Sequence, residues 1–378
     1  RFPARLQVRA DLGMAIAAAS EVLIVVPSHA FAGVCQQLAQ LRPDLRSLSW
    51  ATKGFDPASK ALLSEVAGQL FPRADLAVIS GPTFAREVAA GLPTAITVAA
   101  SSGQHAQRIA ALLRSDSFRP YTSDDLIGVQ VGGACKNVMA IAAGISDGLG
   151  FGANARAALI TRGLSEIMRL GVALGARPET FLGLAGLGDL TLTCTDDQSR
   201  NRRMGLALAR GLSIAQAKVE IGQEVEGVNT TREVHSLGTR LGVEMPLTEQ
   251  AYQVLYAGLD THAAGHNLLA RETRPDAPQV PRGLVSVHPL PEVGLAEGFH
   301  APAVVHVDEV RGLHPVADGE GNFFQNLPPH GIFPGQGLDD GGELGKKQRK
   351  QGADQDFCHP APAGGADTLG GSQRPVVE

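Results

Sequence analysis

The sequence has few aromatic residues, few cysteines and no excess of positive charge. Aromatic side chains make up 4% of its 378 residues, and it contains a single tryptophan. Cys35, Cys135, Cys194 and Cys358 lie far apart without a CxxC pair, which argues against a disulfide framework or a zinc site and fits a reducing cytosol. The net charge of -5 indicates no nucleic acid partner, so any basic site must be local.

Long apolar runs are also lacking. None approaches the length of about 18 residues that a membrane helix needs, so no membrane span is expected. The first residues imitate a secretory signal, with arginines ahead of an apolar stretch at 14–19. Asp11 interrupts that pattern, the stretch is too short and a strand pattern follows at once, so we reject this interpretation. Because residue 1 is Arg and not Met, we expect the chain to begin inside a domain.

Strand and helix patterns alternate over the first third of the chain. The apolar run 21–26 predicts a strand buried on both faces, and further strands are predicted at 45–51, 74–79, 94–99 and 118–121. Helices are predicted at 12–19, 31–41, 60–70, 84–90 and 104–114. This alternation predicts a Rossmann-type α/β parallel sheet over residues 1–123, incomplete at its N-terminus, with ligands at the carboxyl ends of the strands.

Helical patterns alone continue from residue 124 to about 275. The clearest amphipathic stretches are 157–174, 202–209 and 249–256, which predicts an all-helical substrate and catalytic domain over residues 124–275. Residues 276–378 are rich in proline and glycine without a period, as in disordered or non-native sequence. Their histidines lack metal-ligand spacing, so no metal site is expected.

The stretch 130–162 is the most informative. It places Lys136 and Asn137 just after two glycines, in an apolar helix whose pattern indicates burial on almost every side. A buried lysine costs free energy unless a charged partner or an anionic ligand pairs with it. The alternative is that the Lys136 ammonium reaches solvent over its long stem.

A dinucleotide-binding sheet should begin with a strand, a GxGxxG turn and a helix. The formal match at Gly148, Gly150 and Ala153 follows a helix, so we interpret it as a loop between helices. The fingerprint is therefore either absent or upstream of residue 1.

Two loops follow predicted strands. Lys53 in WATKG either faces a cofactor and substrate site or is a solvated loop lysine. In SGPTF, Gly81 and Pro82 form a tight turn that opens the helix carrying Arg86 and Glu87. The backbone N–H groups at that helix start either bind an anion or serve only as a helix cap.

Ser199 is a good N-cap, which places Arg200 and Asn201 in the first turn of a helix. An arginine at that end opposes the helix dipole unless an anion binds there. A phosphate group fits this pattern, and the alternative is a surface basic cluster.

Seven segments occur in an order that identifies a family. They are VPSHAF, WATKGF, ISGPTFAREVAAGLPTA, IGVQVGGACKNVMAIAAGISDGLGFGANARAALITRG, LAGLGDLTLTCT, SRNRRMG and GVEMPLTEQAYQVLY. Over about residues 10–274 the chain closely resembles the bacterial NAD(P)-dependent glycerol-3-phosphate dehydrogenases. The resemblance implies a Rossmann domain, a helical domain, and reversible reduction of dihydroxyacetone phosphate to sn-glycerol 3-phosphate, a phospholipid precursor. It also implies NAD or NADP as cofactor, a cytoplasmic location and a possible homodimer.

Carried over position by position, the resemblance implies that Lys136 is the catalytic lysine, an acid in reduction and a base in oxidation. Burial, Lys53 and Arg200 would lower its pKa, and Asp189 would oppose them. The implied substrate contacts are Lys53, Gly81, Thr83, Lys136, Asp189, Ser199, Arg200 and Asn201. The implied cofactor contacts are Lys53, Ala85, Arg200, Glu224 and Glu226.

The chain also departs from the family pattern. The family's first strand, its glycine-rich turn, the next helix and the second strand have no counterpart here, so a preference for NAD or NADP is unreadable. A sheet without these strands exposes unpaired edges. Two alternatives follow: a two-domain dehydrogenase of the β-hydroxyacid type, which the Arg200–Asn201 pair and the LGDL and SGPTF motifs disfavour, or a catalytically dead fragment of the family.

Overall fold

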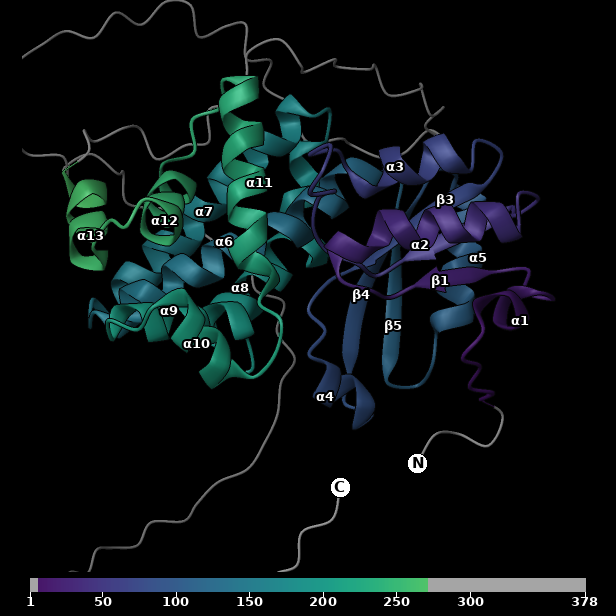
Figure 1. Cartoon of the computed structure of the whole chain (residues 1–378), viewed down its shortest axis with the longest axis horizontal. Helices are drawn as coiled ribbons and strands as arrows, with labels where there is room; N and C mark the ends of the chain where they lie inside the picture. Colours follow the sequence, from purple (N-terminus) through teal and green to yellow (C-terminus); the bar gives the residue numbers. More distant parts are fainter. Residues whose placement is uncertain (1–5, 271–378) are drawn as a thin grey trace, which may run out of the picture. The chain divides into compact units, whose positions relative to one another are not determined.

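The computed structural model describes residues 6–270, and within them a five-stranded sheet precedes a series of helices (Figure 1). The strands follow one another in the order β1-β2-β3-β4-β5. Their bounds are Val22–Ile24 for β1, Ser47–Trp50 for β2, Asp75–Ser80 for β3, Thr94–Ala100 for β4 and Phe118–Ser123 for β5. The predicted Rossmann-type sheet is thus confirmed, with each strand close to its expected place.

The sheet is parallel except at one pair. β1–β2, β2–β3 and β4–β5 are parallel, whereas β3–β4 is antiparallel, with Ser80 opposite Thr97. A parallel connection needs a crossover that returns the chain to the opposite end of the strands. The connection from β3 to β4 contains only the five-residue helix α4 (Ala85–Ala89), which is too short for this crossover. The predicted parallel sheet is therefore mainly parallel, with one antiparallel pair.

Helices cover both faces of the sheet. The remaining helices of this part are α1 (Leu12–Ile16), α2 (Ser28–Leu41), α3 (Leu63–Leu70) and α5 (Gly103–Leu113). Along β3, Leu76 and Val78 pack in one cluster with α2 and α3, while Ala77 and Ile79 pack in another with α5. This alternation places two apolar cores on opposite faces of the strands.

Two local expectations are wrong. Leu23 and Val25 in and after β1 are 46% and 68% exposed, so this strand is not buried on both faces. β1 is an edge strand of the sheet, and these side chains stay exposed among the described residues. The helix expected from residue 60 begins only at Leu63, because Lys60 has a positive φ and a Phe55–Leu62 bridge closes a loop there.

The second part of the described chain is helical. Its α-helices are α6 (Leu126–Gly148), α7 (Gly152–Ala173), α8 (Asp189–Thr195), α9 (Arg200–Ala209), α10 (Ile214–Ile221), α11 (Glu226–Leu241), α12 (Pro246–Tyr256) and α13 (Thr261–Leu269). A 3-10 turn η1 (Pro178–Leu182) and a π turn η2 (Leu184–Gly188) precede α8. Residues 149–151 form a loop between α6 and α7, which is shorter than predicted because Gly148 ends α6 and Ala153 lies in α7. The change from strands to helices falls between β5 and α6, near the predicted boundary at residue 123.

Helix α6 forms the centre of the helical part. α7, α8, α9, α11 and α12 all pack against it. α6 and α9 approach closely, since a Cβ on Gly205 would lie 2.1 Å from the Ile141 carbonyl oxygen. Among the described helices, α6 has the length and hydropathy of a membrane span, but 83% of its apolar window is buried inside the protein.

The described residues lie in one compact unit, so the division into separate domains stays a prediction. The tail predicted at 276–378 lies outside the described residues.

Candidate active site

Lys136 is buried on α6 and is 7% exposed. Its Nζ atom forms an ion pair with Asp189 Oδ1 and donates a hydrogen bond to Thr193 Oγ1 at 2.9 Å. The side chain therefore does not extend to solvent. The predicted charged partner of this lysine is Asp189.

A second lysine contacts the same carboxylate. Lys53 follows β2, and its Nζ atom lies 2.6 Å from Asp189 Oδ2 and donates to the Gly81 carbonyl oxygen at 3.2 Å. Gly54, with φ +143°, turns the chain directly after this lysine. Lys53 and Gly81 thus join the carboxyl ends of β2 and β3 to the helical part, as the sequence predicts for a ligand site.

Asp189 is held between the two lysines and is 1% exposed. Burial alone would raise the pKa of Asp189, but the Lys136 and Lys53 ammonium groups lower it below its ordinary value. Burial lowers the pKa of Lys136 to about 8, Lys53 acts in the same direction, and Asp189 opposes both. The cluster carries two cations and one anion, which leaves a net positive charge for an oxyanion to meet.

The π turn η2 sets the position of Asp189. In this turn Gly186 approaches Phe181 so closely that an added Cβ would lie 2.1 Å from the Phe181 carbonyl oxygen. η2 packs against α6 and leads directly into α8, whose first residue is Asp189. The LAGLGDL segment thus presents the carboxylate to Lys136.

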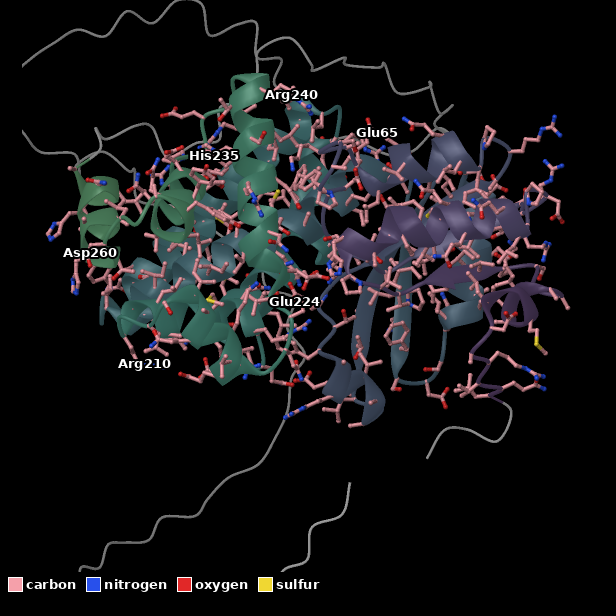
Figure 2. The ribbon with its side chains drawn as sticks, in the orientation of Figure 1. Glu65, Arg210, Glu224, His235, Arg240 and Asp260 are labelled. Atoms are coloured by element: carbon pink, nitrogen blue, oxygen red, sulfur yellow. The ribbon has the colours of Figure 1, made fainter. Side chains whose placement is uncertain are left out.

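The predicted phosphate region lies at the start of α9. Ser199 caps this helix, since its Oγ accepts a hydrogen bond from the Arg202 N–H at 3.2 Å, which confirms the predicted cap. Arg200 is exposed in the first turn and donates to the Glu224 carbonyl oxygen at 2.8 Å. Glu224 lies in the loop before α11 (Figure 2).

Asn201 uses its amide to connect three helices. Its Nδ2 donates to Asn137 Oδ1 on α6 at 2.9 Å, and its Oδ1 accepts from the Gly227 N–H on α11 at 2.9 Å. Since Asn137 adjoins Lys136 in α6, this network connects the phosphate region to the lysine cluster. Asn201 therefore holds protein groups in the structure, whereas the sequence suggested a contact with substrate.

The SGPTF segment forms the turn after β3. Gly81 has φ +141°, and the Thr83 hydroxyl donates to the Gly81 carbonyl oxygen at 3.1 Å. Ala85 is the exposed first residue of α4. Glu87 of α4 accepts a hydrogen bond from Gln198 at 2.9 Å, which joins this turn to the segment before α9.

Glu226, the first residue of α11, lies near the same groups. Burial raises the pKa of Glu226, while Arg200, Lys53 and the Ser28 backbone N–H act in the opposite direction. Ser28 begins α2 at the carboxyl end of β1. Glu226 thus approaches a helix start at the carboxyl end of a strand, the side of a doubly wound sheet on which ligands bind.

Sequence reasoning assigned no role to Thr193 and Asn137. Thr193 contacts Lys136 and also donates from Oγ1 to the Asp189 carbonyl oxygen at 2.6 Å. It stands four residues after Asp189, and this helical spacing is the signal that could have identified it. Asn137 could have been inferred only from its place beside Lys136.

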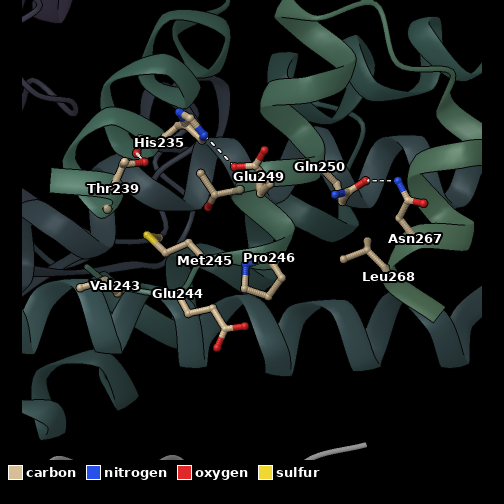
Figure 3. A pocket seen from close by; sticks show the side chains of 12 residues that line it. His235, Thr239, Val243, Glu244, Met245, Pro246, Glu249, Gln250, Asn267 and Leu268 are labelled. Carbon is tan, nitrogen blue, oxygen red and sulfur yellow. Dashed lines mark hydrogen bonds and ion pairs between the residues drawn. The ribbon is translucent and has the colours of Figure 1, made fainter. Parts of the chain in front are cut away.

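A metal site and a second pocket were the other candidates within residues 6–270. Among the described residues, no group of three or more His, Cys, Asp or Glu side chains could hold a metal ion, and the three described cysteines are buried and free. A pocket of about 270 Å³ lies among α11, α12 and α13, but it contains none of the predicted site residues (Figure 3). Its wall includes a His235–Glu249 pair at 2.7 Å.

The fold joins a Rossmann-type sheet to a helical part, and a buried lysine of the helical part lies at the carboxyl ends of the strands. This arrangement defines the class of nicotinamide-dependent dehydrogenases. Comparison with known proteins identifies the family within this class. Residues 1–106 match the NAD-dependent glycerol-3-phosphate dehydrogenase N-terminus, and residues 125–266 match the corresponding C-terminus. The chain belongs to the glycerol-3-phosphate dehydrogenase family.

Individual relatives agree with this assignment. The glycerol-3-phosphate dehydrogenase (NAD(P)+) of Edwardsiella ictaluri is 58% identical over 277 residues, which cover 72% of this chain and 82% of that protein. The Aeromonas salmonicida enzyme of the same name is 58% identical over 279 residues, with the same coverage of 72% and 82%. The crystal structure of glycerol-3-phosphate dehydrogenase from Coxiella burnetii matches with a TM-score of 0.69 and 47% identity, over 71% of this chain and 83% of that one.

Proposed function

We propose that this chain catalyses the reversible, NAD(P)H-dependent reduction of dihydroxyacetone phosphate to sn-glycerol 3-phosphate. The observation that carries the proposal is the Lys53–Asp189–Lys136 cluster, in which both lysines of the predicted site share one buried carboxylate. The family assignment supports the same reaction and does not favour a β-hydroxyacid-type dehydrogenase. The product would supply glycerophospholipid synthesis.

Lys136 is the proton donor in this mechanism. The reduced nicotinamide, when bound, supplies a hydride to C2 of the substrate, and the proton that completes the alcohol comes from Lys136 Nζ. A pKa of about 8 keeps this ammonium group protonated at neutral pH and still allows it to act as a base in oxidation. Thr193 orients the Nζ atom by its hydrogen bond.

Lys53 and Asp189 set the charge around the reacting oxygen. The oxygen becomes more negative as the hydride arrives, and the Lys53 ammonium group stabilises that charge. Asp189 neutralises one of the two cations and fixes both Nζ atoms in one place. The net positive charge of the cluster then favours the alkoxide over the neutral ketone.

The phosphate group binds at the start of α9. Arg200 and the backbone N–H groups next to the Ser199 cap offer charge-assisted hydrogen bonds, and the Gly81–Thr83 turn faces the substrate from β3. Asn201 contributes by holding α9 to α6 and α11, and its second Nδ2 hydrogen would donate to the ligand. Arg200 exchanges its contact with the Glu224 carbonyl oxygen for the phosphate.

The cofactor site rests on the carboxyl ends of the strands. Lys53, Ala85, Arg200, Glu224 and Glu226 would contact the nicotinamide half. The half-buried Glu226 carboxylate beside the Ser28 N–H fits this assignment, since it places a hydrogen-bond acceptor at the start of α2, next to the carboxyl end of β1. We assign NAD or NADP without a preference, a cytoplasmic location and a homodimer as parts of the proposal.

The test is oxidation of NADH and of NADPH by the purified full chain with dihydroxyacetone phosphate. We expect Lys136→Ala to lower kcat by about a thousandfold, the usual range for loss of a general acid. Lys218→Ala, on α10 and outside the site, is the matched control and should retain full turnover. Normal turnover by Lys136→Ala would exclude this lysine as the acid.

A substrate panel separates the remaining alternatives. Faster turnover of a β-hydroxyacid than of glycerol 3-phosphate would select the other class of dehydrogenase. Binding of glycerol 3-phosphate without any turnover or cofactor binding would identify a catalytically dead member of the family.

A further inference from the structure

Two glycines on α6 precede Lys136 by about one turn, and each lies against a different neighbour. A Cβ added to Gly132 would lie 2.6 Å from the Ala185 carbonyl oxygen. A Cβ added to Gly133 would lie 2.7 Å from Ser80 Oγ, and 3.6 and 3.7 Å from Lys53 Cγ and Cδ. Gly132 therefore packs on the backbone of η2, whereas Gly133 packs on the side chains of two strand ends.

We propose that Gly133 is a positioning residue for Lys53: its bare Cα leaves on α6 the space in which the Lys53 stem lies. Gly133 and Lys136 are three residues apart and share one face of α6. The Lys53 stem therefore crosses α6 one turn before Lys136, and its Nζ atom reaches the same Asp189 carboxylate. The inference rests on the proposed function only in taking both lysines as parts of the reaction.

Ser80 is the other neighbour of Gly133, and its hydroxyl is dispensable in this arrangement. The side chain is buried, and its Oγ atom has no hydrogen-bond partner among the described residues. Because no bond is lost, Ser80→Ala should leave the site intact. In that background the atoms nearest to a Cβ at position 133 are Cγ and Cδ of Lys53.

The size of the new side chain decides the effect. The contacts of 3.6 and 3.7 Å from an alanine Cβ to the Lys53 stem are ordinary van der Waals distances, so Gly133→Ala fits beside it in the Ser80→Ala background. The γ-methyl groups of Gly133→Val extend further and need the space of the Lys53 stem. Valine, but not alanine, should therefore separate Lys53 from Asp189.

Displacement of Lys53 changes the titration of Lys136. Lys53 lowers the pKa of Lys136 from across the shared carboxylate. Loss of this second cation should raise the pKa of Lys136 above its value of about 8, as Lys53→Ala itself should. A protein that is only less stable would not show this shift.

The experiment titrates the Lys136 ammonium group by NMR in the full chain, with all variants made in the Ser80→Ala background. We expect Gly133→Val and Lys53→Ala to raise the pKa of Lys136 alike, and Gly133→Ala to leave it unchanged. Gly133→Val should also lower kcat/KM by about a hundredfold, as for a misplaced catalytic group. The matched control is Gly33→Val on α2, where the added atoms meet open space.

A double variant keeps the test decisive when Gly133→Val folds poorly. Lys53→Ala removes the stem that valine displaces, so Gly133→Val should add nothing to Lys53→Ala and should fold in that background. The inference is overturned when folded Gly133→Val titrates like its parent, or when Lys53→Ala fails to restore its folding. The titration needs no turnover, so an inactive parent chain would contradict the proposed function and leave this result interpretable.

Discussion

At the scale of residues, Asp189 is the group on which the site depends. It pairs with Lys53 and Lys136 while almost fully buried, and both lysines require its charge. Removing one member of a buried ion cluster leaves the others without compensation, which costs more than the loss of an exposed pair. The function of both lysines therefore depends on the Asp189 carboxylate.

Asp189→Asn should destabilise the protein by about 3 kcal/mol, because two ammonium groups then share a buried site without a counter-charge. The pKa of Lys136 should fall further, since Asp189 is the group that raises it. Urea unfolding measures the first effect, and kcat with dihydroxyacetone phosphate should drop at least about a hundredfold. Asp116→Asn, at an exposed position, is the control, and equal stability of the two variants would contradict this account.

The residues of the site were predictable to different degrees. Lys136 stood out because a lysine interrupts a buried apolar pattern, and Ser199 because a cap precedes a helix. The contact of Asn201 with Asn137 was not predictable, since it joins residues that are far apart in sequence. Thr193 lies four residues after Asp189 in the sequence. That spacing indicates a contact with Lys136 only when Lys136 is already known to lie beside Asp189.

At the scale of elements, close approach of α9 to α6 positions the phosphate region. A Cβ on Gly205 would meet the Ile141 carbonyl oxygen at 2.1 Å and the Ile145 nitrogen at 2.7 Å, both backbone atoms of α6. Backbone atoms cannot rotate away as a side chain can. An added methyl group must therefore move α9, which carries Arg200 and Asn201.

Gly205→Ala should accordingly destabilise the protein by about 2 kcal/mol, as overpacking does, and raise KM for the phosphate substrate more than it lowers kcat. Gly33→Ala on α2, where the methyl group meets open space, should be neutral or slightly stabilising. Thermal unfolding and steady-state kinetics provide both comparisons. Unchanged stability of Gly205→Ala would mean that the two helices do not pack this closely.

Glu166 connects two other elements. This buried residue of α7 accepts hydrogen bonds from the Leu247 and Thr248 N–H groups at 2.6 and 3.2 Å, at the start of α12. Burial raises the pKa of Glu166 from its ordinary value of 4.5 to about 7, against the effect of those N–H groups. Between pH 4.5 and about pH 7, Glu166 is therefore protonated in the folded state and deprotonated in the unfolded state.

A carboxyl group whose pKa is raised by folding stabilises the fold below its unfolded pKa, and this contribution is lost as the pH rises through the folded pKa. We expect the free energy of unfolding to fall, on the order of 2 kcal/mol, from pH 5 to pH 8 because of Glu166. Denaturant unfolding of Glu166→Gln should show a weaker pH dependence, and exposed Glu179→Gln should match the parent. Burial also raises the pKa of Glu233 to about 7, so the stability of Glu166→Gln should still fall somewhat with pH. An unaltered slope in Glu166→Gln would contradict the assignment.

Element types followed from the sequence more readily than their surroundings. The alternation of strand and helix patterns placed each strand. The apolar run of β1 was expected to be buried on both faces, because a run does not reveal which neighbours are present. The antiparallel β3–β4 pair depended on the length of α4, a detail that periodicity alone does not weigh. The start of α3 was displaced by the left-handed Lys60, which no propensity marks.

At the scale of the whole molecule, the sheet and the helices meet at one buried carboxylate. Lys53 comes from the sheet, and Lys136 and Asp189 come from the helices, so the site exists only when both parts are folded. The family membership and overall reaction were accessible from ordered motifs. The resemblance also implied that Lys53 and Asp189 act on the pKa of Lys136, but not that both lysines share one carboxylate, because that depends on a contact between positions 53 and 189.

The pH dependence of glycerol 3-phosphate oxidation tests this account most directly. Oxidation needs Lys136 deprotonated, so kcat/KM should rise with pH through an apparent pKa near 8 and then level off. Lys53→Met should move this rise to higher pH, because the cation that lowers the pKa of Lys136 is lost. A rate that is flat through pH 8, or a rise that stays in place in Lys53→Met, would contradict the shared Lys53–Asp189–Lys136 cluster as the source of catalysis.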